Sequence, residues 1–150
     1  MKYLFITVVL LLMQGCSYKN AYTFFSMDKT EERYETNTFN AKIQTQEEVL
    51  GILSVTYLNN VDKNISQKTE NFLVSLYMKD PQRDYYFLLN QKQPLSVKPV
   101  PKDSRYAPLL KKQLQWSTIS IVTFQHSDDL NLTFYTYPSV SVSMNFLKEQ

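Results

Sequence analysis

The segment 126–129 holds a histidine and two carboxylates close together, a combination that can move protons or bind a metal ion. His126 is followed by Asp128 and Asp129, and an imidazole titrates near neutral pH. The whole chain has one His and one Cys, so the further ligands of a usual transition-metal set are missing. We therefore interpret 126–129 as a polar hairpin turn between two strands, and we predict no catalytic residue, no metal site and no cofactor.

Pairs of neighbouring carboxylates do not point to hydrolysis either. They occur at residues 31–32, 47–48 and 128–129. A glycosidase needs two carboxylates that face each other across a cleft, whereas neighbours on a strand point to opposite faces of the sheet. With two glycines in 150 residues, a Gly-rich phosphate loop is also excluded. We predict a protein that is not an enzyme, with an envelope hydrolase around His126 as the weakest alternative.

The first 17 residues have the layout of an export signal. Lys2 precedes the mostly apolar run 3–13, YLFITVVLLLM. This length fits the hydrophobic part of a signal peptide and is too short for a transmembrane helix, which needs about 20 residues. Gln14, Gly15 and Cys16 follow this run, and polar residues come next.

Residues 13–16, MQGC, resemble the cleavage motif of bacterial lipoproteins, which is Leu, then Ala or Ser, then Gly or Ala, then Cys. Gly15 and Cys16 match this motif, and the first two positions depart from its usual residues. The resemblance implies that a signal peptide, 1–15, is removed and that Cys16 carries lipid. Acyl chains on Cys16 supply a stable membrane anchor. Because Ser17, and not Asp, follows the Cys, the resemblance further implies the outer membrane, facing the periplasm.

The remainder is expected to be a short tether followed by one β-rich domain. Residues 16–40 are polar and irregular, with acids suited to the first turn of a short helix. Residues 41–150 contain runs of β-branched and aromatic residues separated by turn residues. The predicted strands lie at 49–58, 71–78, 84–89, 94–100, 117–125, 130–137 and 139–146. A helical spacing is found at 106–115.

These patterns predict an antiparallel β-sandwich, immunoglobulin-like or transthyretin-like, with six to eight strands and one short helix. The run 139–146 alternates strictly between apolar residues and Ser or Asn, which indicates one buried and one wet face. Two prolines in 94–100 restrict that strand to a sheet edge. Because Gly51 is the one glycine left after processing, we expect loops of about 3–5 residues or more, built on Asn, Asp and Pro.

A basic, proline-punctuated segment at 91–113 is the predicted partner-binding patch. It holds six basic residues and one acid, Asp103. Such a patch can attract anionic head groups or an acidic partner, although a solvated crossover loop has the same composition. The basic residues are Lys92, Lys98, Lys102, Arg105, Lys111 and Lys112.

Two short stretches, 62–66 (DKNIS) and 129–133 (DLNLT), resemble the extended acceptor sequence of bacterial N-glycosylation. Asn131 lies in a predicted strand, where a glycan fits poorly. Asn64 lies in a predicted loop and is therefore the candidate acceptor.

Together these features predict a lipid-anchored envelope lipoprotein that acts as a non-catalytic interaction or assembly module. Its expected partners are the membrane, through the anchor, and an envelope protein. A net charge of +2 argues against nucleic acid, which leaves a strongly basic footprint. A sandwich that binds a small ligand or a glycan through some of its eleven Tyr and nine Phe residues remains open as the alternative.

Overall fold

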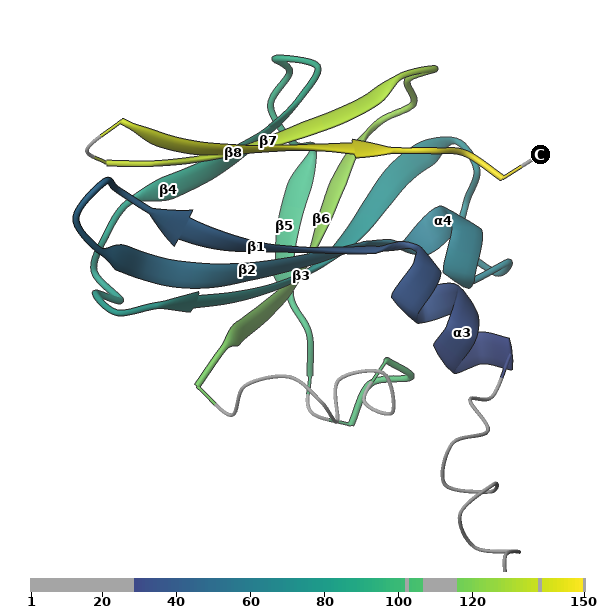
Figure 1. Ribbon diagram of the computed structural model, residues 1–150. Coiled ribbons are helices and arrows are strands. Elements are labelled where there is room, and N and C mark those ends of the chain that lie inside the picture. The colour runs from purple at the N-terminus through teal and green to yellow at the C-terminus, as the bar shows by residue number, and fades with distance from the viewer. Residues whose placement is uncertain (1–28, 102, 107–115, 138, 150) are drawn as a thin grey trace, which may run out of the picture.

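The computed structural model describes residues 29–101, 103–106, 116–137 and 139–149. Figure 1 shows two stacked β-sheets, with two short helices at the end where the last strand leads to the C-terminus. The elements in chain order are α3 (Lys29–Thr36), β1 (Thr38–Gln44), β2 (Val49–Tyr57), α4 (Leu58–Val61), β3 (Thr69–Met78), β4 (Tyr85–Leu89), β5 (Ser96–Pro99), β6 (Thr118–Gln125), β7 (Leu130–Thr136) and β8 (Val140–Phe146).

All strand pairs are antiparallel, and the strand order is that of an immunoglobulin-like sandwich with one added strand. The five-stranded sheet has the order β1-β2-β3-β6-β5, and the three-stranded sheet has the order β4-β7-β8. If β2 to β8 are taken as strands A to G, the sheets become A-B-E-D and C-F-G, the arrangement of immunoglobulin constant domains. The extra strand β1 pairs with β2 at the sheet edge. The predicted antiparallel β-sandwich is therefore confirmed.

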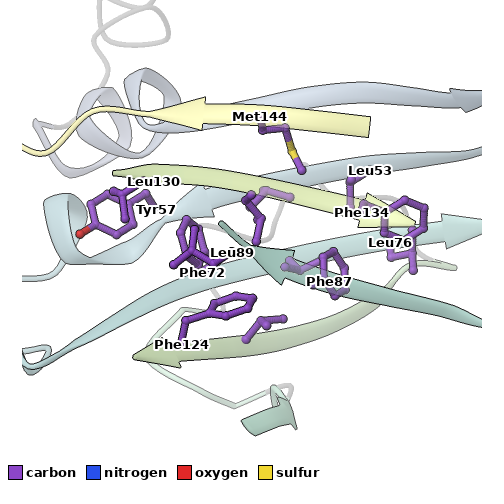
Figure 2. Packing of buried hydrophobic residues seen from close by; sticks show 14 of the residues in the cluster. Leu53, Tyr57, Phe72, Leu76, Phe87, Leu89, Phe124, Leu130, Phe134 and Met144 are labelled. Atoms are coloured by element: carbon purple, nitrogen blue, oxygen red, sulfur yellow. The ribbon is translucent and has the colours of Figure 1, made fainter. Parts of the chain in front are cut away.

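The core lies between the sheets because alternate residues of each strand point inward. Phe72 on β3 packs edge to face against Phe124 on β6, with ring centroids 5.9 Å apart. From the other sheet, Leu132 and Phe134 of β7 are fully buried. Figure 2 shows Phe72, Phe124 and Phe134 among the side chains that fill the space between the two layers. Each fully buried Leu or Phe stabilises the fold by about 1.5–3 kcal/mol relative to an exposed one.

The outer face of the five-stranded sheet carries a second apolar cluster. Leu73 of β3 points away from the main core and is buried with Leu58 and Tyr106. Other residues of this sheet and its flanking segments pack against them: Tyr34, Ile65, Val100, Ile119 and Ile121. Both faces of β3 are thus covered at Leu73.

The outer face of the three-stranded sheet is open. On β8, Val140, Val142, Met144 and Phe146 pack toward the core, while Ser141, Ser143 and Asn145 are exposed. The predicted alternation is therefore confirmed. This open sheet face contrasts with the partly covered face on the other side of the sandwich.

The predicted hairpin at residues 126–129 is wrong. The segment joins β6 of the five-stranded sheet to β7 of the three-stranded sheet, so it crosses from one layer to the other. A connection of four residues can join two neighbouring strands of one sheet or cross between sheets. The alternation of apolar and polar residues shows which face of a strand is buried, but it does not show which strand pairs with it. β5 lies at the sheet edge, as its prolines predict.

Among the described residues, positions with positive φ are taken by residues other than glycine. Asn90 and Gln91 adopt positive φ angles of 47° and 66° in a tight turn between Leu89 and Lys92, and Asn tolerates this conformation better than most residues. Gly51 lies inside β2, where an added Cβ would be 2.3 Å from the carbonyl oxygen of Tyr77. Gly51 is thus needed for close strand packing and not for a turn.

The helical content lies near the start of the described chain. α3 begins at Lys29 with Glu31 and Glu32 in its first turn, and α4 is a single turn. β1 begins at Thr38, within the segment expected to be tether. Most of the helix predicted at 106–115 lies outside the described residues. Among the described residues, no helix is long and apolar enough to cross a membrane.

Candidate functional site

A buried glutamate, absent from the predicted sites, is the centre of a tight polar cluster. Glu70 lies at the start of β3 with 1% of its surface exposed. Its Oε2 accepts a hydrogen bond from the Tyr57 hydroxyl at 2.5 Å. Its Oε1 accepts from Lys148 Nζ at 2.8 Å and from the Ser127 backbone N–H at 3.2 Å. His126 Nδ1 lies 2.8 Å from the same oxygen.

The donors around Glu70 hold it in its charged form. Burial by itself raises the pKa of Glu70, but the hydrogen bonds to it, that of Lys148 first, bring the pKa below its ordinary value of 4.5. Burial and the adjacent carboxylate raise the pKa of Tyr57 well above its ordinary value of 10.0. The phenol therefore stays protonated and donates to the carboxylate.

This cluster joins three parts of the chain that are distant in sequence. Glu70 comes from β3, Ser127 from the crossing between the sheets, and Lys148 from the segment after β8. Asn60 holds the same C-terminal segment, because its amide donates to the Leu147 carbonyl at 2.8 Å. Both carboxylate oxygens of Glu70 accept hydrogen bonds. The cluster therefore links the five-stranded sheet to the segments that precede β7 and follow β8 of the other sheet.

Of the predicted His-carboxylate group, the structure brings only His126 and Asp128 near each other. His126 Nε2 lies 4.0 Å from Asp128 Oδ1, and Asp128 is fully exposed. Asp129 contributes its backbone carbonyl to the Asn90 amide at 2.6 Å. In the described part of the chain, no group of three or more His, Cys, Asp or Glu side chains is placed to hold a metal ion.

The predicted basic patch is placed only in part. Lys92 lies in the tight turn after β4 and Lys98 on edge strand β5, and both are exposed. The Arg105 guanidinium is paired with Asp62 at 2.8 Å and lies 5.0 Å from the ring centroid of Tyr106. This pair joins the loop after β5 to the segment that follows α4. Lys102, Lys111 and Lys112 lie outside the described residues.

The two predicted modification sites differ in what the structure describes. Asn64 is exposed in the loop before β3, and its backbone N–H donates to Asp62 Oδ1 at 3.0 Å. Its use as a glycan acceptor stays a prediction. Cys16 lies outside the described residues, as does the predicted signal peptide 1–15.

The open face of the three-stranded sheet forms a regular grid of neutral side chains. Its first row pairs Tyr86 of β4 with Tyr135 of β7, and Tyr135 in turn with Ser141 of β8. The second row is Leu88, Thr133 and Ser143, and the third contains Asn131 and Asn145. We call these eight residues the open sheet face.

A groove lies on this face beside Tyr135. The Tyr86 and Tyr135 rings stack with centroids 5.0 Å apart and planes 12° from parallel. Tyr86 remains 56% exposed. The groove has a volume of about 370 Å³ and is lined by Leu88, Asn90, Gln91, Asn131, Thr133 and Tyr135. This volume is at the lower end of the range of small-molecule sites, about 300–1,000 Å³.

Comparison of the chain with protein-family models, with curated proteins and with solved structures gives no match. The assignment of a function to this fold therefore rests on its own residues and geometry.

Proposed function

We propose that the protein is a lipid-anchored module of the cell envelope whose immunoglobulin-like sandwich binds a partner without catalysing a reaction. The lipoprotein-type motif at residues 13–16 supports the anchor at Cys16, and Ser17 after it supports a location on the outer membrane facing the periplasm. β1 begins at Thr38, inside the 16–40 segment, so a short stretch of chain links the proposed anchor to the domain.

The difference between the two outer sheet faces supports the open sheet face as the binding surface. Apolar side chains of the chain itself cover the part of the outer face of the five-stranded sheet around Leu73, while Ile52 on the same face is exposed. The open sheet face carries two stacked tyrosines and a row of amides and hydroxyls. Tyr is enriched in binding surfaces because it combines a large apolar ring with a polar hydroxyl.

The Glu70 cluster supports the proposed binding role indirectly, because it holds the two sheets together. Its buried carboxylate is held by Tyr57, Lys148 and the backbone of the crossing. Such a network fixes the relative position of the two sheets. The open sheet face is thereby presented on a rigid support, which reduces the ordering entropy lost on binding.

Crosslinking in intact membranes tests the proposal. The variant Ser143→Arg places a long charged side chain in the centre of the open sheet face, and Ile52→Arg does the same on the exposed part of the opposite sheet. We expect a crosslinked envelope product with the wild type and with Ile52→Arg, and its loss with Ser143→Arg. Equal products from all three proteins would contradict the proposal.

The anchor has its own test. Mass spectrometry of the mature N-terminus is expected to show a chain that begins at an acylated Cys16. Unmodified Met1 or unmodified Cys16 would contradict the lipoprotein assignment.

A further inference from the structure

The groove beside Tyr135 has the chemistry of a site for an uncharged, hydroxyl-rich ligand. Its six lining residues contribute amides, one threonine hydroxyl, one tyrosine and one leucine. Asn and Gln amides offer both donors and acceptors, and the Thr hydroxyl offers both as well. Pairs of adjacent sugar hydroxyls present the same mixture of donors and acceptors.

Tyr135 provides a flat apolar wall. One side of its ring is stacked on Tyr86. Ser141 lies beside Tyr135 on the neighbouring strand β8, outside the lining of the groove. An aromatic ring has a negative face, and the polarised C–H groups on one side of a pyranose ring fit such a face.

The polar floor of the groove is already ordered. Asn131 Nδ2 donates to Asn145 Oδ1 at 2.7 Å. The Thr133 hydroxyl lies 3.2 Å from both Asn131 Oδ1 and the Ser143 hydroxyl. Since these bonds fix the side-chain orientations in advance, a ligand loses less free energy in ordering them.

The far wall is a turn in a fixed conformation. Asn90 Nδ2 donates to the Asp129 carbonyl at 2.6 Å and to the Ser127 hydroxyl at 2.8 Å, and Asn90 Oδ1 accepts from the Asn131 backbone N–H. These bonds hold the positive φ angles of Asn90 and Gln91. The exposed Gln91 amide is thereby presented at the edge of the groove.

Charge decides the class of ligand. No Asp, Glu, Lys, Arg or His is among the described residues that line the groove. A charged ligand would lose hydration there without gaining a counter-charge, so the site complements a neutral one. The face also exposes Ser141 and Ser143, and Ser is depleted in protein–protein interfaces. A neutral saccharide therefore fits better than a protein surface.

We propose that the groove between Tyr135 and the Asn90–Gln91 turn binds a neutral oligosaccharide segment. A sugar ring packs against the Tyr135 side chain, and the amides of Gln91 and Asn131 hydrogen-bond its hydroxyls. This inference rests on the proposed function, since it names the chemistry of the partner that the open sheet face binds.

Calorimetric titration of the full-length protein tests the proposal. The protein is kept in a detergent without a sugar head group, and the probes are cellotetraose, chitotetraose, maltotetraose and the acidic tetragalacturonate. We expect saturable binding of at least one neutral probe, with tetragalacturonate at least about tenfold weaker. The variants are Tyr135→Leu, Gln91→Ala and the matched control Tyr77→Leu, which lies on the outer face of the other sheet.

We expect Tyr135→Leu and Gln91→Ala to weaken binding by at least about tenfold and Tyr77→Leu to leave it unchanged; urea unfolding confirms that each variant is folded. Three results would overturn the inference: no neutral probe bound up to about 10 mM, equal loss in all three variants, or tighter binding of the acidic probe. If these probes fail while Ser143→Arg still abolishes the envelope crosslink, the saccharide proposal is wrong and the open sheet face binds a protein instead.

Discussion

Replacing Glu70 with Leu is expected to destabilise the domain strongly, although Leu is apolar and similar in size. The substitution removes the acceptor for Tyr57, Lys148 and Ser127. Lys148 is 31% exposed and can bind water instead. Tyr57 is 2% exposed, so its hydroxyl is left buried without a partner.

The size of the effect follows from these contacts. Leaving one buried donor unsatisfied costs about 1–3 kcal/mol, and a hydrogen bond to a charged group contributes about 1.5–3 kcal/mol. Relief from burying the carboxylate offsets part of this loss. We expect Glu70→Leu to lower the free energy of unfolding by about 3 kcal/mol, a large share of the ~5–15 kcal/mol typical of a domain.

Urea unfolding of the detergent-solubilised protein, followed by circular dichroism, measures this loss. A double-mutant cycle with Tyr57→Phe isolates the unsatisfied hydroxyl. With Phe at position 57, the loss caused by Glu70→Leu should shrink by about 1–3 kcal/mol. A Glu70→Leu variant as stable as the wild type, or strictly additive effects in the cycle, would refute the role of Glu70 in linking the two sheets.

The pKa of Glu70 gives the sign of its pH dependence. Because the folded-state pKa is below the ordinary value of 4.5, the charged form contributes stability above that value. This contribution is lost as the pH falls through the folded-state pKa. The difference in stability between the wild type and Glu70→Gln should therefore be largest near neutral pH and shrink in acid, and a difference that grows in acid would contradict the account.

Three further substitutions test other parts of the structure. Gly51→Ala should lower the free energy of unfolding by about 1–3 kcal/mol, because the new Cβ collides with the Tyr77 carbonyl; unchanged urea unfolding would count against the close packing of β2 and β3. Arg105→Gln should cost about 1 kcal/mol through loss of the Asp62 pair, and the same unfolding assay at high salt should show a smaller difference. Cys16→Ser should abolish incorporation of radiolabelled fatty acid into the protein, and a label that persists would exclude Cys16 as the acylated residue.

The strands could be predicted because their pattern is local. The alternation of Val and Ser in β8 requires one buried and one exposed face whatever the partner strand is. The covered outer face of β3 could be predicted in the same way, since Leu73 and Tyr77 are apolar on the side away from the core. The pairing of strands could not be predicted, because it depends on contacts between residues far apart in the chain.

Glu70 was missed although a signal for it exists in the sequence. It lies two residues before Phe72, in the same alternation that places Phe72, Val74 and Leu76 in the core. A charged residue at an inward position must have partners. Those partners, Tyr57 and Lys148, come from distant segments, so the sequence indicates that Glu70 is buried but not what it contacts.

The open sheet face could be predicted only in part. The exposed Ser141 and Ser143 follow from the alternation in β8. The stacking of Tyr86 on Tyr135 depends on the register between β4 and β7, and the groove depends on the tight turn at Asn90. Both arise from tertiary pairing that local patterns do not encode.

Cysteine labelling in native membranes tests the central claim most directly. If Cys16 is acylated, the mature wild type has no free thiol, so a single introduced cysteine is the sole site of reaction. Ser143→Cys reports on the open sheet face, and Ser66→Cys reports on an exposed loop far along the chain from it. We predict that Ser143→Cys is protected in membranes and reacts after purification, while Ser66→Cys reacts in both. Equal reaction of Ser143→Cys in membranes and after purification would contradict a bound partner on this face.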